Sequence, residues 1–228
     1  MTRRAIGGGT LALGAVRTVI YGSRPDGHAK VIAALAAAAG IEVAGLIDDF
    51  EANRERTIGE LRVIGTSEDL PRLREQGVDG LLIGYGENAG RAGVVERVLA
   101  AGLALPNLVH PTAFLYPTAQ LGVGVHVFPH GHVGPDAVLG DGVLINTGAS
   151  VEHDCVIEDG AVILPGARLG GRVRIGREAS IGTGAILLPD ARVGAGAVVG
   201  AGAVVLREVP PGVTFVGVPA RELVRDRR

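Results

Sequence analysis

One histidine in the second half of the chain stands between two carboxylates. His153 is preceded by Glu152 and followed by Asp154. Imidazole exchanges a proton near neutral pH without any perturbation, and a neighbouring carboxylate can orient the ring and strengthen its basicity. This arrangement predicts a general base, His153, assisted by Asp154. The alternative is an ordinary surface histidine beside a turn residue, and both interpretations stay open at this point.

The element that must position His153 is a six-residue repeat. Every sixth residue from Leu115 to Val205 is Leu, Ile or Val, sixteen positions in all. The residue two places before each of these is often Ala, and the residue three places after is usually Gly or Asp. Small and aliphatic residues two apart describe a short strand with both side chains inward, and Gly or Asp tolerates the positive φ of a sharp corner. The repeat therefore predicts a parallel β-helix.

The repeat also fixes what surrounds His153. Three hexads close a coil of eighteen residues, so the repeat makes about five coils. His153 lies two places after a repeat position and should point outward. Gly171 follows eighteen residues later and is expected to stack over His153 in the next coil, where its backbone N–H could polarise a carbonyl oxygen. Asp154 falls at a corner position that Asp136 and Asp190 share, which favours the turn-residue interpretation of Asp154.

Composition argues against several classes of protein. The net charge is −2 with no basic block, which argues against nucleic acid as the main partner. The single cysteine, Cys155, excludes an internal disulfide, fits a reducing compartment and occupies the small inward position of the repeat, which favours a core role. No apolar run is long enough to span a bilayer, and we expect a cytoplasmic protein with a disordered extension at residues 1–17.

Residues 18–109 alternate between apolar, β-prone runs and helical runs. We expect strands at 18–21, 41–47, 61–64 and 81–83, the third of them a short edge strand, and helices at 28–39, 66–77 and 91–101. Strands separated by helices predict a small Rossmann-like parallel sheet with helices on its faces. Ligands of such sheets lie at the carboxyl ends of the strands.

Three segments gather at that edge of the predicted sheet. Residues 22–28 join the first strand to its helix, where backbone N–H groups can meet an anion. Asp48 and Asp49 end the second strand, where an acid often contacts ribose hydroxyls. Residues 84–88 end the later strand. These segments predict a nucleotide-like or sugar ligand. Because the pattern G-x-G-x-x-G is absent, tight turns and a solvated acidic pair in a purely structural domain are the alternative.

Several motifs together resemble one family of sugar acetyltransferases. They are Gly27-His28, Asp48-Asp49 and the runs 146–155, 165–171 and 215–220. These motifs and their order along residues 18–222 resemble the sialic-acid O-acetyltransferase family. That family includes the N-acetyltransferases of UDP-linked 4-amino sugars in bacterial glycan synthesis. The resemblance implies a left-handed β-helix, a homotrimer with active sites between subunits, and acetyl-CoA as the donor without a metal.

The resemblance also assigns roles to single residues. His153 matches the catalytic base and Asp154 the acid beside it. The positions that match sugar-nucleotide contacts are Gly27, His28, Asp48, Asp49 and Gly86. The positions expected along coenzyme A are Gly171, Thr183, Ala201 and Val162, the last of which replaces a histidine that relatives often carry near the thioester. We therefore expect acetyl transfer to an amino group of a UDP-linked amino sugar, with O-acetylation of a sialic acid as the alternative.

Two further alternatives come from other classes. Some left-handed β-helix trimers are carbonic anhydrases that hold zinc between histidines, and His126, His130 and His132 are close in sequence. Their repeat positions differ and no second row of ligands stacks eighteen residues along, so they need not converge. The other alternative is a non-catalytic scaffold. The expected parts are the extension (1–17), a sugar- or nucleotide-binding domain (18–109), an acetyltransferase β-helix (110–222) and a tail (223–228).

Overall fold

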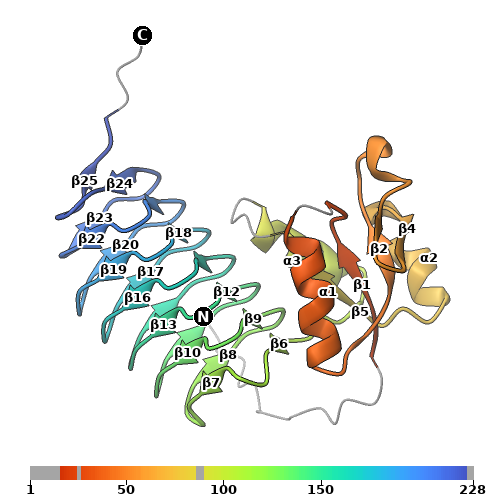
Figure 1. Cartoon of the computed structure of the whole chain (residues 1–228), viewed down its shortest axis with the longest axis horizontal. Helices are drawn as coiled ribbons and strands as arrows, with labels where there is room; N and C mark the ends of the chain where they lie inside the picture. The colour runs from red at the N-terminus through yellow and green to blue at the C-terminus, as the bar shows by residue number, and fades with distance from the viewer. Residues whose placement is uncertain (1–15, 25–26, 86–89, 225–228) are drawn as a thin grey trace.

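The chain folds into an α/β part and a stack of short strands. A computed structural model describes residues 16–24, 27–85 and 90–224. Figure 1 shows the α/β part beside the strand stack, which rises coil by coil from β7 to β25. None of the helices in these described ranges is long and apolar enough to cross a membrane.

A five-stranded sheet forms the centre of the α/β part, in the order β3-β4-β2-β1-β5. Its strands are β1 (Arg17–Tyr21), β2 (Glu42–Ile47), β3 (Thr57–Ile58), β4 (Leu61–Gly65) and β5 (Gly80–Ile83). β4, β2, β1 and β5 run parallel, as the alternation of strand and helix predicted. β4 is not the edge strand that we expected, because the chain turns at Gly59 and β3 pairs antiparallel on its outer side.

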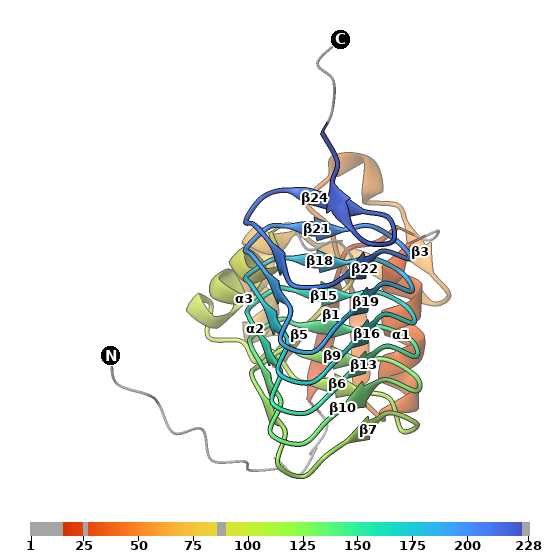
Figure 2. The same ribbon diagram turned by 90° about the vertical axis from the view of Figure 1, so that its left-hand side faces the viewer.

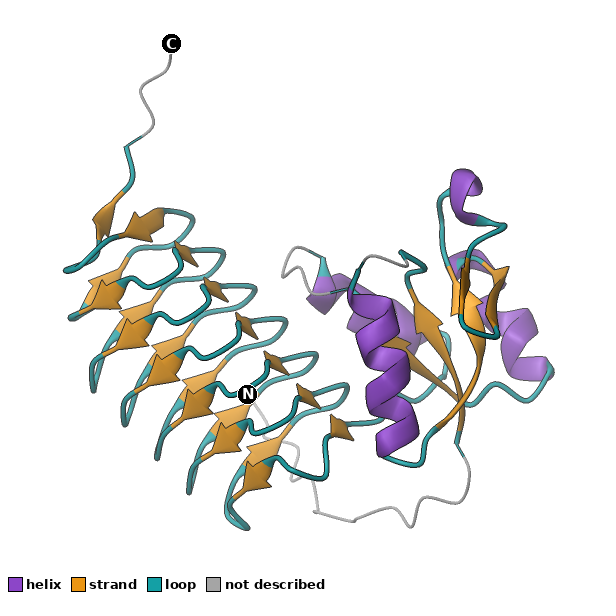
Figure 3. Ribbon diagram, viewed as in Figure 1, coloured by secondary structure: helices purple, strands orange, loops and turns teal. Residues whose placement is uncertain are grey.

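Helices cover both faces of this sheet, and Figure 3 shows the helices confined to this part of the described chain. The helices are α1 (His28–Ala38), α2 (Leu70–Glu75) and α3 (Arg91–Ala100), with 3-10 turns η1 (Glu51–Asn53) and η2 (Ser67–Asp69). Successive strand residues point to opposite faces. Ile20 therefore packs in the cluster that contains α1, whereas Val19 packs in the cluster that contains α2 and α3. The carboxyl ends of the strands are left for a ligand.

Residues 108–222 wind into three sheets of short strands, one above another in each sheet (Figure 2). The β7 face contains β7 (Phe114–Leu115), β10 (His132–Val133), β13 (Ser150–Val151), β16 (Arg168–Leu169), β19 (Ile186–Leu187) and β22 (Val204–Val205). The β8 face contains β8 (Gln120–Leu121), β11 (Val138–Leu139), β14 (Val156–Ile157), β17 (Arg174–Ile175), β20 (Arg192–Val193) and β23 (Glu208–Val209). The β6 face contains β6 (Leu108–Val109), β9 (His126–Val127), β12 (Leu144–Ile145), β15 (Val162–Ile163), β18 (Ser180–Ile181), β21 (Val198–Val199), β24 (Thr214–Val216) and β25 (Arg221–Glu222).

Strand pairing confirms the eighteen-residue coil. Val133 pairs with Val151 and Val151 with Leu169, and the same offset continues to the pair of Leu187 with Val205. The last coil is two residues shorter, since Val193 pairs with Val209. The β-helix also begins two residues earlier than the expected boundary at 110, because Leu108 already pairs in β6.

The repeat residues and the small residues before them fill the interior of the β-helix. The corners carry the positive φ that the repeat predicted: even the non-glycine corner residues Asp136, Asp154 and Asp190 have φ of 58°, 58° and 65°. Cys155 is buried, and burial raises the pKa of its thiol to about 11. The prediction that Cys155 belongs to the core is thus confirmed, and its thiol is poorly suited to act as a nucleophile.

The two parts of the chain share an apolar junction. Phe128, Leu144 and Val162 on the β6 face belong to the same buried cluster as the residues of α1. Arg91 at the start of α3 lies at the polar side of this junction, where its Nε donates to the Gly142 carbonyl at 2.9 Å. These contacts hold the carboxyl edge of the sheet close to the β-helix.

Candidate active site

His153 lies on the corner between the β7 face and the β8 face, directly after β13. Its Nδ1 is 2.7 Å from Asp154 Oδ2, and the two side chains are 46% and 55% exposed. Asp154 therefore does two things at once. It adopts the left-handed corner conformation, as the turn-residue interpretation expected, and its carboxylate also holds the imidazole. With Nδ1 engaged by the carboxylate, Nε2 is the ring nitrogen left for proton transfer.

Gly171 lies directly over the His153 ring, as the eighteen-residue spacing predicted. A Cβ on Gly171 would come within 2.3 Å of His153 Nε2 and 2.5 Å of Cε1. The site therefore requires glycine because of the close approach of the ring. Within the described chain no hydrogen bond uses the Gly171 N–H.

An ion pair that the sequence did not predict lies on the same corner. Arg172 donates its backbone N–H to the His153 carbonyl at 2.9 Å. Its guanidinium forms two bonds with Asp190, at 2.7 and 2.8 Å. Hydrogen bonding and charge from Arg172 hold the pKa of the Asp190 carboxyl below its usual range. The signal that could have revealed this pair is the eighteen-residue spacing of the corner residues 154, 172 and 190.

A cavity of about 600 Å³ lies at the carboxyl ends of β1, β2 and β5. Its walls include most of the residues expected to meet a sugar nucleotide and several that were not singled out: Tyr21, Gly22, Ser23, Arg24, Gly27, His28, Asp48, Asp49, Phe50, Asn53, Gly84, Tyr85, Gly90, Val94 and Arg97. Gly86, the remaining expected contact, lies outside the described residues. The cavity joins the three segments that the sequence placed at this edge of the sheet.

The two acids of this cavity are already engaged within the chain. Asp48 is buried and accepts hydrogen bonds from Ser23 N–H and Oγ, Phe50 N–H and Asn53 Nδ2. Asp49 accepts from the Tyr21 hydroxyl and from the N–H and Oγ of Ser67. Asp48 and Asp49 therefore fix the shape of the walls, and the contact of both residues with the ligand stays a prediction.

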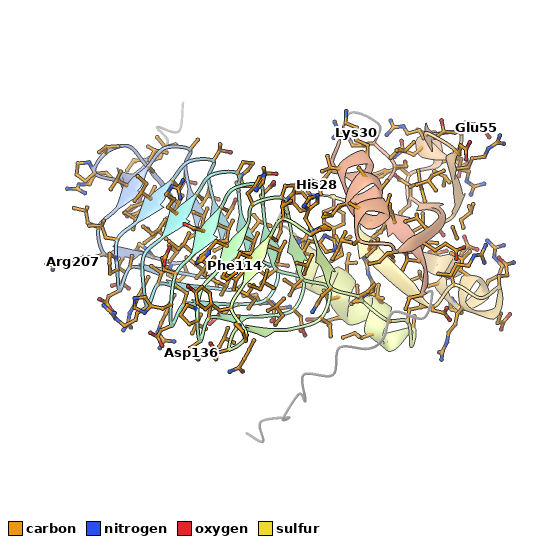
Figure 4. All side chains as sticks on the ribbon, turned by 60° about the horizontal axis from the view of Figure 1, so that its bottom comes forward. His28, Lys30, Glu55, Phe114, Asp136 and Arg207 are labelled. Carbon is orange, nitrogen blue, oxygen red and sulfur yellow. The ribbon has the colours of Figure 1, made fainter. Side chains whose placement is uncertain are left out.

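His28 forms the wall of the cavity nearest the β-helix. Its ring stacks on Phe128 with the centroids 5.0 Å apart, and Figure 4 shows it at the end of α1 that faces the β-helix. Burial, helped by the charge of Arg91, lowers the pKa of His28 to about 4. His28 is therefore neutral at physiological pH. Beneath it, His126 is fully buried, and desolvation lowers the pKa of His126 well below its usual range.

The positions expected along coenzyme A lie on different parts of the β-helix. Thr183 and Ala201 are exposed and stacked on the corner between the β6 and β7 faces, where Gly202 N–H donates to the Thr183 carbonyl at 2.9 Å. This is a different corner from that of His153. Val162 is only 1% exposed and packs in the junction with α1, so its side chain does not border the His153 corner. One chain alone does not bring these positions together.

The three histidines of the zinc alternative point to different places. His126 lies on the β6 face and is buried, His130 is exposed at a corner, and His132 lies on the β7 face beside Phe114. Among the described residues, no group of three or more histidine, cysteine or acidic side chains is arranged to hold a metal ion.

Comparison with known proteins gives the family. The model of the PglD N-terminal domain matches residues 18–98, and the six-repeat model of the bacterial transferase hexapeptide matches residues 136–171 and 172–207. A histidine-to-alanine variant of GDP-perosamine N-acetyltransferase from Caulobacter crescentus, solved with CoA and GDP-perosamine, is 36% identical; the match covers 95% of this chain and 100% of that chain with a TM-score of 0.86. This chain belongs to the PglD-type family of hexapeptide-repeat sugar N-acetyltransferases.

Two more solved structures agree with this assignment. The acetyltransferase domain of PglB from Neisseria gonorrhoeae, solved with acetyl coenzyme A, is 37% identical, with 92% of this chain and 100% of that chain covered and a TM-score of 0.83. WeeI from Acinetobacter baumannii is 27% identical, with 90% and 99% covered and a TM-score of 0.75. No curated protein matches the chain. As a member of this family the chain is a sugar N-acetyltransferase that uses acetyl-CoA, and its β-helix is left-handed.

Proposed function

We propose that the protein transfers an acetyl group from acetyl-CoA to the amino group of a nucleotide-linked sugar, with His153 as the general base. The observation that carries this proposal is the exposed imidazole held between the Asp154 carboxylate and Gly171. The GDP-perosamine N-acetyltransferase relatives, whose solved complexes contain CoA and GDP-perosamine, support the class of acceptor. Two of those structures are variants in which one histidine is replaced.

The residues at the His153 corner divide the chemical work. As the acceptor nitrogen attacks the thioester carbonyl, it must lose a proton, and a neutral imidazole can take that proton through Nε2. Asp154 holds Nδ1–H, which fixes the tautomer and stabilises the imidazolium that forms. The Gly171 N–H would stabilise the negative charge that develops on the carbonyl oxygen. The carbon–nitrogen bond forms, the carbon–sulfur bond breaks, and the imidazolium of His153 gives its proton to the departing thiolate, so that coenzyme A leaves as the thiol and the base is regenerated.

The site is completed by a second copy of the chain. His153 lies on one corner of the β-helix and Thr183 and Ala201 lie on another. Head-to-tail contacts between identical chains bring two different surfaces together, and such contacts close into a ring when the rotation allows. We infer a homotrimer in which one subunit supplies His153 and its neighbour supplies the corner of Thr183. Analytical ultracentrifugation should show a trimer at micromolar concentration, and a monomer would contradict this inference.

The acceptor is tested by release of the free thiol of coenzyme A with different sugars. UDP-linked 4-amino sugars are the acceptors that the sequence predicts, and the GDP-perosamine complexes make GDP-linked amino sugars the second class to test. We expect one of these two classes to be acetylated, with the matching nucleoside diphosphate competing against the acceptor and not against acetyl-CoA. Acetylation of free sialic acids, with no turnover of any nucleotide-linked amino sugar, would contradict the proposal.

A further inference from the structure

Aromatic side chains are scarce in this chain, and three of them lie at one cavity. The sequence contains four Phe, three Tyr and no Trp. Three of these seven residues, Tyr21, Phe50 and Tyr85, line the cavity at the carboxyl edge of the sheet. Tyr21 and Tyr85 contact each other edge to face, with the ring centroids 6.0 Å apart. Phe50 is different, because it is 72% exposed and has no ring partner among the described residues.

The exposed ring of Phe50 stands on a fixed turn. Phe50 N–H donates to Asp48 Oδ1 at 3.0 Å, and the Phe50 carbonyl accepts from Asn53 N–H at 2.8 Å. The Asn53 side chain donates to the same Asp48 oxygen at 2.8 Å. The other oxygen of Asp48 accepts a hydrogen bond from Ser23, which lies in the loop after β1, the strand beside β2. Asp48 therefore locks the turn that carries Phe50 to the loop that follows β1.

An exposed phenyl ring at the wall of a cavity offers a flat apolar face to a planar ligand. Leaving a Phe side chain in water forgoes the roughly 1.5–3 kcal/mol that its burial would give. Aromatic rings that bind nucleotides recover this by stacking on the base, which works for every base because each has a π-face. The same cavity is lined by Arg24 and Arg97, whose charges suit phosphate groups. A planar group joined to an anionic group describes a nucleotide.

We propose that Phe50 is the platform on which the nucleobase of the acceptor stacks, and this rests on the proposed function, in which the acceptor is nucleotide-linked. The stack contributes to the affinity for the nucleoside diphosphate and not to the recognition of the amino group, which must reach His153. Phe50 therefore determines KM for the acceptor, while His153 determines kcat. Because stacking tolerates every base, Phe50 favours nucleotide-linked sugars over free sugars without selecting uracil or guanine.

The absence of tryptophan allows a direct test by fluorescence. Phe50→Trp introduces the single Trp of the chain, and UDP or GDP stacked on it should quench its emission in a saturable way. Phe114→Trp is the matched control, since Phe114 is also exposed but lies on β7 and does not line the cavity. We expect quenching in the first variant and none in the second. Equal emission with and without bound nucleotide in Phe50→Trp would overturn the stacking geometry.

The second arm measures affinity by calorimetry. Phe50→Ala should weaken binding of UDP or GDP by roughly 5- to 150-fold, the range that base–aromatic stacking gives, while Phe50→Tyr should retain most of it. KM for acetyl-CoA and binding of the amino sugar 1-phosphate, which lacks the base, should not change. If the wild-type protein binds nucleoside diphosphates and Phe50→Ala binds them equally well, the inference fails alone. If the wild-type protein binds none of them, the proposed function fails with it.

Discussion

Replacement of Gly171 by alanine tests whether the His153 ring works in the place where the structure puts it. The backbone of Gly171 is not in the left-handed region, so alanine can adopt it without strain. The new Cβ would lie 2.3 Å from His153 Nε2 and 2.5 Å from Cε1. The substitution should therefore displace the His153 ring, and the β-helix around it should stay folded.

The size of the effect follows from these distances. An ordinary contact between the Cβ and the ring is roughly 3.5 Å, so the ring must move by about 1 Å. Such a movement turns Nε2 away from the acceptor and stretches the bond from Nδ1 to Asp154, which is 2.7 Å long. A misplacement of about 1 Å can cost about 10²-fold in rate. We expect Gly171→Ala to lower kcat by roughly that factor with little change in coenzyme A affinity.

The assay is release of the coenzyme A thiol at saturating acceptor and donor, with two controls. Gly93→Ala adds a methyl group in open space on α3 and should leave kcat unchanged. The double variant Gly171→Ala/His153→Ala should be no slower than His153→Ala alone, because both changes act through the same ring. If Gly171→Ala keeps a kcat within about threefold of wild type, the reasoning about the ring is refuted.

Two further predictions concern charge and protonation. Asp154→Asn should lower kcat less than His153→Ala does, because asparagine tolerates the corner φ of 58° and still contacts Nδ1 but cannot stabilise the imidazolium; an unchanged kcat would leave Asp154 a corner residue only. The folded-state pKa of His28, about 4, lies below its ordinary value of 6.5, so the folded chain resists a proton that the unfolded chain accepts. The contribution of His28 to stability should thus be complete above pH 6.5 and be lost by up to about 3 kcal/mol as the pH approaches 4. Thermal unfolding of wild type and His28→Gln from pH 7 to 4.5 should show this decline reduced in the variant, and identical slopes would contradict it.

The sequence predicted most of the β-helix because its repeat is strictly local. Each hexad buries one aliphatic residue and turns one corner, so the position of Gly171 over His153 follows from counting eighteen residues. The repeat stops after Val205, since the residue expected at 211 is Pro. The repeat alone does not show that a further, shorter coil follows with Val209 in the inward position. The strand β3 was missed since two residues, Thr57 and Ile58, give no periodicity to detect.

The sugar-nucleotide site was harder to predict than the catalytic corner. The sequence places Asp48 and Asp49 at a strand end. It does not show that Asp48 accepts hydrogen bonds from Ser23 and Asn53, or that Asp49 accepts one from Ser67. Phe50 was not among the predicted site residues, because the sequence does not show that its side chain is exposed at the cavity. The sequence also does not show that the α/β part packs over Val162 and buries its side chain, and its place along coenzyme A stays a prediction.

The most direct test of His153 as the general base is the turnover of His153→Ala with acetyl-CoA and a nucleotide-linked amino sugar. We expect kcat to fall by ~10²–10⁴-fold, the usual effect of removing a general base, with the coenzyme A affinity measured by calorimetry unchanged. His130→Asn is the matched control, because His130 is another exposed histidine at a corner with positive φ and should keep wild-type activity. A kcat of His153→Ala close to that of wild type would contradict the assignment of His153 as the base.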